Sequence, residues 1–95
     1  MSDEKKHPRI EFKLPERLAG GVYANNMVVA HTREEFVLDF MTLYNPRAGV
    51  VTARVIVSPG HLKRIVRALA ENLARYEARH GELSEAAAPG DEQVN

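Results

Sequence analysis

The spacing of the apolar side chains changes at Ser58-Pro59, and this boundary limits what the chain can fold into. Before it, residues 50–57 are mostly β-branched, as the interior of a strand prefers. After it, apolar residues recur at three- and four-residue steps as far as Tyr76, which is typical of an amphipathic helix. Ser58 can cap this helix through its hydroxyl, and Pro59 suits the first helical position. The boundary predicts a strand followed at once by a helix over residues 59–80.

The predicted helix has an apolar side and a basic side. Gly81 suits a left-handed C-cap, and Arg79 and His80 before it suit the carbonyl end of the helix dipole. The apolar stripe consists of Leu62, Ile65, Val66, Leu69, Leu73 and Tyr76. The candidate basic face consists of Lys63, Arg64, Arg67, Arg75 and Arg79.

Three segments before this boundary also have strand character. Residues 9–14 alternate strictly between polar and apolar, which predicts a half-buried edge strand. Residues 22–31 are apolar around Asn25-Asn26, where we expect a bulge or a side-chain bond to a neighbouring loop. Residues 36–43 are aromatic and aliphatic, with short polar connections on either side. We therefore predict an α+β fold: a four-stranded antiparallel meander followed by one long C-terminal helix packed on the sheet.

Asp39 indicates the register of the last hairpin, because a charged residue is disfavoured in mid-strand. With residues 45–48 as the loop, Asp39 lies opposite Arg54, and we expect a cross-strand ion pair. Phe36, Leu38 and Phe40 then share one apolar face. With the helix stripe, they form the main part of the predicted core.

The other face of this hairpin is also apolar, with Val50 among its members, and one helix cannot cover both faces. Soluble monomers rarely leave such a patch in water. A two-fold dimer is the commonest way to bury it, so the sequence predicts a homodimer. The candidate interface consists of Val37, Asp39, Met41, Arg54 and Ile56.

The length of 95 residues fits one domain. We expect a disordered N-terminal tail over residues 1–8, a single domain over 9–83 and a disordered acidic tail over 84–95. A domain this small buries a modest share of its surface, which again favours oligomerisation.

Composition excludes several classes of protein. Thirteen basic and thirteen acidic side chains give a formal net charge of zero, which argues against a protein that mainly coats DNA or RNA. The absence of cysteine excludes disulfides, Fe–S clusters and cysteine catalysis. No apolar run approaches the roughly 20 residues that span a bilayer, and the start lacks the apolar core of a signal peptide. We therefore expect a cytoplasmic protein with no membrane partner.

The residue types that carry catalysis stand in no recognisable arrangement. The four histidines form no set of convergent metal ligands, and we expect no metal or other cofactor. No Gly-x-Ser-x-Gly elbow surrounds Ser58, which already has a role as a helix cap. The sequence therefore does not predict an enzyme.

Three runs, in this order, resemble one family. They are Gly-Val-Tyr-Ala-Asn-Asn at 21–26, Glu-Phe-Val-Leu-Asp-Phe at 35–40, and Arg-Val-Ile-Val-Ser-Pro at 54–59 leading into Ala-Glu-Asn-Leu-Ala-Arg-Tyr-Glu at 70–77. Over about residues 19–83 the chain resembles the short bacterial and archaeal proteins grouped as domain of unknown function 3467. The resemblance implies a small cytoplasmic protein without established enzymatic activity, and it brings no catalytic or ligand residues.

Three functions are compatible with these patterns. The first is a non-enzymatic protein-interaction module that acts as a homodimer, either an adaptor or a regulatory subunit for a protein partner. The second is nucleic-acid binding through the basic face, although the spacing of Glu71 and Arg75 suits an ion pair within a solvated face. The third, by architectural analogy with export chaperones, is a chaperone-like binder of unfolded chains.

Overall fold

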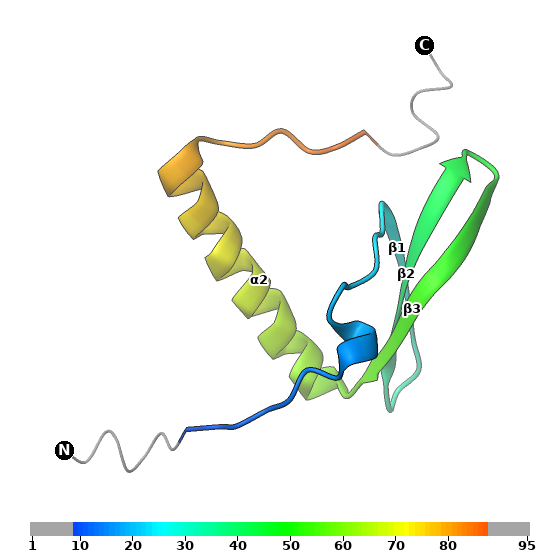
Figure 1. Cartoon of the computed structure of the whole chain (residues 1–95), viewed down its shortest axis with the longest axis horizontal. Helices are drawn as coiled ribbons and strands as arrows, with labels where there is room; N and C mark the ends of the chain where they lie inside the picture. Colours follow the sequence, from blue (N-terminus) through cyan, green and yellow to red (C-terminus); the bar gives the residue numbers. More distant parts are fainter. Residues whose placement is uncertain (1–8, 88–95) are drawn as a thin grey trace.

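The computed structural model describes residues 9–87 and shows an antiparallel sheet joined to a long helix (Figure 1). The elements, in chain order, are η1 (Glu16–Leu18), β1 (Asn26–His31), β2 (Phe36–Asn45), β3 (Ala48–Val57) and α2 (Pro59–His80). The strands lie in the order β1-β2-β3, and each is antiparallel to its neighbour. The predicted α+β class is confirmed, but the meander has three strands and not four. Along the described residues, no helix is long and apolar enough to cross a membrane.

The predicted first strand over residues 9–14 is wrong. This segment pairs with no strand of the described chain, and Ile10 and Phe12 are 80% and 87% exposed. Alternation shows which side chains would share a face, but a strand forms only where its backbone pairs with a neighbouring strand. Here Pro15 ends the segment and leads directly into η1. The predicted tail over residues 1–8 and most of the predicted tail over 84–95 lie outside the described residues.

The predicted register of the β2–β3 hairpin is confirmed as far as Phe40. Phe36 pairs with Val57, Leu38 with Val55, Asp39 with Arg54, and Phe40 with Ala53.

Beyond Phe40 a bulge at Thr52 changes the pairing. Met41 pairs with Val51, and Thr42 pairs with Val50. Val50 therefore lies on the opposite face from the one we predicted, because a shift of one residue moves a side chain across the sheet.

The turn of this hairpin is also tighter than predicted. Asn45 already pairs with Ala48, so only Pro46 and Arg47 connect the two strands. The Asn45 side chain accepts a hydrogen bond from the Arg47 backbone N–H at 2.8 Å, which stabilises the short turn.

The helix α2 begins and ends at the predicted residues. The Ser58 hydroxyl accepts a hydrogen bond from the His61 backbone N–H at 3.2 Å, so Ser58 is the N-cap. Gly81 has a φ of 98° and its N–H donates to the Glu77 carbonyl at 2.9 Å. A positive φ costs glycine little, which explains why the helix stops there.

The predicted packing of α2 on its own sheet is wrong. In Figure 1 the helix starts where β3 ends and leans away from the strands. Leu69 and Leu73, in the middle of its apolar stripe, are 65% and 50% exposed. Within the described residues Leu38, at 7% exposure, is the only buried side chain of the predicted core. The reason lies in the connection, because Ser58 is the single residue between β3 and α2.

Replacing Ser58 with alanine should destabilise the protein by about 1 kcal/mol, because the His61 N–H then loses its side-chain acceptor. Urea denaturation followed by far-UV circular dichroism, at one protein concentration, measures the free energy of unfolding. The matched control is Ser84→Ala, which changes an exposed serine beyond the end of α2. Equal free energies of unfolding for the two variants would contradict the capping role.

Candidate protein-interaction surfaces

The pairing gives the sheet two faces that differ in character. Side chains of directly paired residues point to the same face of a sheet, so the register assigns each residue to one of the two. The aromatic face consists of Met27, Val29, His31, Phe36, Leu38, Phe40, Thr42, Val50, Ala53, Val55 and Val57. The charged-pair face consists of Asn26, Val28, Ala30, Val37, Asp39, Met41, Leu43, Val51, Arg54 and Ile56.

The charged-pair face brings together the five residues predicted as an interface. Val37 pairs with Ile56, Asp39 with Arg54, and Met41 lies two residues beyond Asp39 on the same strand. Val51 takes the place that we predicted for Val50. Nothing in the β-branched run of residues 50–52 marks which residue bulges, so the sequence could not have identified Val51.

The centre of this face is a two-pronged ion pair. The Arg54 Nε lies 2.7 Å from Asp39 Oδ1, and its Nη2 lies 2.9 Å from Asp39 Oδ2. The Asp39 side chain is 16% exposed and that of Arg54 is 62% exposed. The hydrogen bonds from Arg54, together with its positive charge, lower the pKa of Asp39 against the opposing effect of desolvation. Both groups are thus satisfied by one another, as expected for a pair that sets the register.

Asn25 uses its side chain in place of a strand backbone. Its amide nitrogen donates to the Leu43 carbonyl at 3.0 Å, and its amide oxygen accepts from the Leu43 N–H at 2.8 Å. These bonds satisfy the edge of β2 beyond the point where β1 begins. Of the two predicted alternatives at Asn25-Asn26, the structure shows the side-chain bond, made to a strand and not to a loop.

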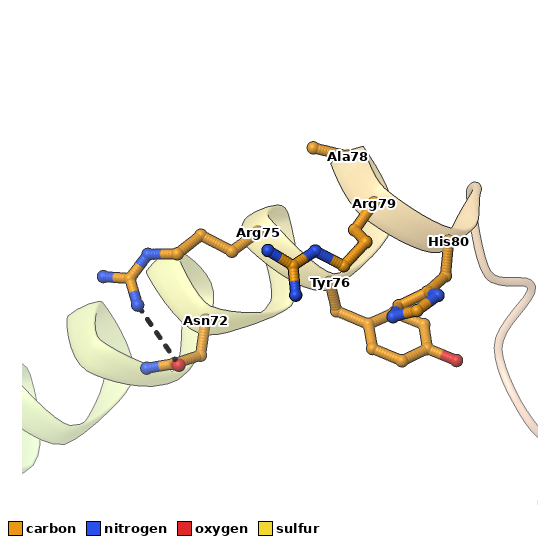
Figure 2. Close-up of a pocket in the computed structure, with 6 residues that line it drawn as sticks. All are labelled: Asn72, Arg75, Tyr76, Ala78, Arg79 and His80. Atoms are coloured by element: carbon orange, nitrogen blue, oxygen red, sulfur yellow. Dashed lines mark hydrogen bonds between the residues drawn. The ribbon is translucent and has the colours of Figure 1, made fainter.

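The basic face lies on the side of α2 opposite the apolar stripe, and its five side chains are all exposed. Figure 2 shows the C-terminal end of this helix, where Asn72, Arg75, Arg79 and His80 line a shallow hollow beside Tyr76. The Tyr76 and His80 rings lie 4.8 Å apart between centroids. This face is therefore accessible to a charged partner.

The predicted Glu71–Arg75 ion pair does not form. Arg75 instead points toward Asn72, whose side-chain oxygen lies 3.5 Å from Arg75 Nη1 (Figure 2). Over residues 9–87, the ion pair between Arg54 and Asp39 is the only one present. The cations of the basic face thus have no carboxylate partner within that part of the chain.

The histidines of the described chain lie apart from one another. His31 contacts the Phe36 ring at 5.1 Å between centroids, His61 is in the first turn of α2, and His80 is at its end. The described residues contain no cluster of three or more potential metal ligands. His7 lies outside the described residues.

Comparison with known proteins gives one match. A family described as a protein of unknown function, DUF3467, matches residues 1–85. No curated protein and no solved structure is detectably similar to the chain.

Replacing Asp39 with asparagine should lower the melting temperature at neutral pH and have less effect in acid. Arg54 holds the folded-state pKa of Asp39 below its ordinary value of 3.8. The carboxylate therefore contributes stability that is present above that value and is lost as the pH falls through the folded-state pKa. The melting temperatures of the wild type and the variant, measured at equal protein concentration, should differ at about pH 7 and approach each other as the pH is lowered to about 2.

The matched control for this pH series is Glu71→Gln, which removes a carboxylate that makes no ion pair with the rest of residues 9–87. It should leave the pH dependence unchanged. A difference between wild type and Asp39→Asn that stays constant with pH would show that the ion pair contributes nothing through its charge.

Proposed function

We propose that this chain, which belongs to the DUF3467 family of proteins of unknown function, is a small non-enzymatic protein-interaction module that acts as a homodimer. The observation that carries this proposal is the uncovered apolar surface of the single chain. Leu38 is its one buried hydrophobic residue within the described range, while side chains on both sheet faces and along α2 stay exposed.

Such a surface is unfavourable in water. Burial of apolar area is the main force that stabilises folded proteins, at about 25 cal/mol per Å². Residues 9–87 contain one buried hydrophobic side chain and many that stay half-exposed, so a single copy gains only part of this term, and soluble monomers rarely expose apolar patches of such extent. A second copy of the same chain offers matching surfaces, and two-fold pairing closes them without leaving an open end.

The roles of the polar side chains support a non-enzymatic module. Ser58 caps α2, Asn25 completes the edge of β2, and Asp39 binds Arg54. Each of these residues is held by a backbone group or a partner charge, which supports a structural role for it. An adaptor or regulatory subunit needs surfaces of this kind and no catalytic group.

A homodimer predicts a mass of twice 10.6 kDa by light scattering at micromolar concentration. The melting temperature should rise with protein concentration, because unfolding of a dimer also separates its chains. A mass of 10.6 kDa that does not change on concentration would contradict the proposal.

Nucleic-acid binding is a second candidate, favoured by the basic face. Lys63, Arg64 and Arg67 are exposed on the side of α2 away from the apolar stripe, so they would remain accessible in a dimer that buries the stripe. Phosphates bind such a row of cations with an affinity that falls steeply as salt concentration rises.

A salt titration of binding to random-sequence duplex DNA tests this candidate. Affinity that falls steeply with salt, and that the double variant Arg64→Gln, Arg67→Gln weakens, would support nucleic-acid binding. If no binding is measurable at low salt, nucleic-acid binding is contradicted and the protein-interaction module is the remaining candidate. Glu71→Gln, on the same side of α2, is the control for a change of side chain without loss of a cation.

A further inference from the structure

We infer that the two chains of the homodimer exchange helices, so that α2 of each copy packs on the aromatic face of the other copy's sheet. This inference rests on the proposed homodimer and names the surfaces that join it. A second copy of this chain thus covers the aromatic face, and three features of the structure support this arrangement.

The first feature is the short connection between β3 and α2. Ser58 is extended, with φ −71° and ψ 157°, and its hydroxyl accepts from the His61 N–H. Its carbonyl accepts from the Leu62 N–H at 3.0 Å, and the ring of Pro59 fixes the next φ. These bonds fix the first turn of α2 relative to Ser58, so the direction in which the helix leaves the sheet depends on the few torsions between Val57 and Ser58. Short hinges of this kind favour exchange between copies.

The second feature is the match between the two apolar surfaces. Exposure along the stripe is lowest beside the junction: Leu62 and Ile65 are half-buried, whereas Leu69, Leu73 and Tyr76 are 65%, 50% and 47% exposed. The 22 residues of α2 span about 33 Å at about 1.5 Å per residue. The ten residues of β2 span about 34 Å at about 3.4 Å per residue. One α2 helix is therefore long enough to cover β2 from end to end.

The third feature is the side of the sheet on which α2 lies. Thr42 continues the alternation of Phe36, Leu38 and Phe40, and its hydroxyl donates to the Tyr23 carbonyl at 2.9 Å. The chain between η1 and β1 therefore lies over the aromatic face. Figure 1 shows α2 on this same side of the sheet. Two copies that approach with their aromatic faces toward each other bring each helix to the other sheet.

The sequence pointed instead to the charged-pair face as the dimer interface. That prediction assumed that α2 covers the aromatic face within one chain, and the structure shows that it does not. Arg54 is 62% exposed, and burying it between two sheets would remove water from its charge. The strand residues of the aromatic face include His31 but no Asp, Glu, Lys or Arg, so burying this face takes no ion pair out of water.

Cysteine crosslinking tests the exchange directly, because the chain contains no cysteine of its own. The double variant Leu69→Cys, Val55→Cys places one thiol on the stripe and one on the aromatic face. A short bismaleimide should join two copies and give a covalent dimer on a denaturing gel. Chains crosslinked only within themselves, or the absence of any crosslink between positions 69 and 55, would overturn the exchange. The matched control is Leu69→Cys, Ile56→Cys, whose second thiol lies on the opposite face and should give no product.

Two substitutions that introduce a carboxylate distinguish failure of the helix exchange from failure of the homodimer. Leu69→Glu should reduce the light-scattering mass to that of one chain. Ile56→Glu should leave the mass at that of two chains. The reverse result would overturn the exchange while keeping a homodimer joined by the charged-pair face. A wild type that is monomeric would overturn both. If Leu69→Glu fails to fold, the crosslinked double variant still decides between exchange and closure within one chain.

Discussion

The capped junction at Ser58 is the constraint on which the rest of this structure depends. Its hydroxyl and carbonyl both accept hydrogen bonds from the first turn of α2, and the ring of Pro59 fixes the φ of the first helical residue. Because α2 leads away from β3, the apolar stripe beyond Ile65 stays exposed within one chain. The uncovered core is thus a consequence of a well-formed helix start, and not of a sequence too poor in apolar residues to build one.

The sheet itself is specified by polar contacts at a few positions. Asp39 and Arg54 mark one register, and the Asn25 side chain satisfies the edge of β2 where β1 is too short to reach. The Thr52 hydroxyl lies 3.2 Å from the Phe40 carbonyl at the bulge. A charged or amide group in a strand costs stability unless it is paired, so each such residue also discriminates against a shifted register. These polar residues therefore act in folding, although their residue types are also those that sites use.

Prediction from the sequence was accurate where the signal is local and inaccurate where it depends on distant surfaces. The bounds of α2 follow from Ser58, Pro59 and Gly81, which act through their own neighbours. The pairing of Asp39 with Arg54 follows from alternation in two adjacent strands. The bulge at Thr52 could not be predicted, because Val50, Val51 and Thr52 have similar strand preferences. The packing of α2 could not be predicted either, since periodicity shows that a helix has an apolar side but not which chain covers it.

Helix exchange would also determine which surfaces remain for a protein partner. With the stripe and the aromatic face buried, the dimer presents the charged-pair face of each sheet and the basic face of each helix. An antiparallel sheet tolerates water on one face, and the exposed Arg54 guanidinium suits that position. Both remaining surfaces carry charge at or near their centres. Recognition of a partner there would depend on charge complementarity, which speeds association and makes it sensitive to salt.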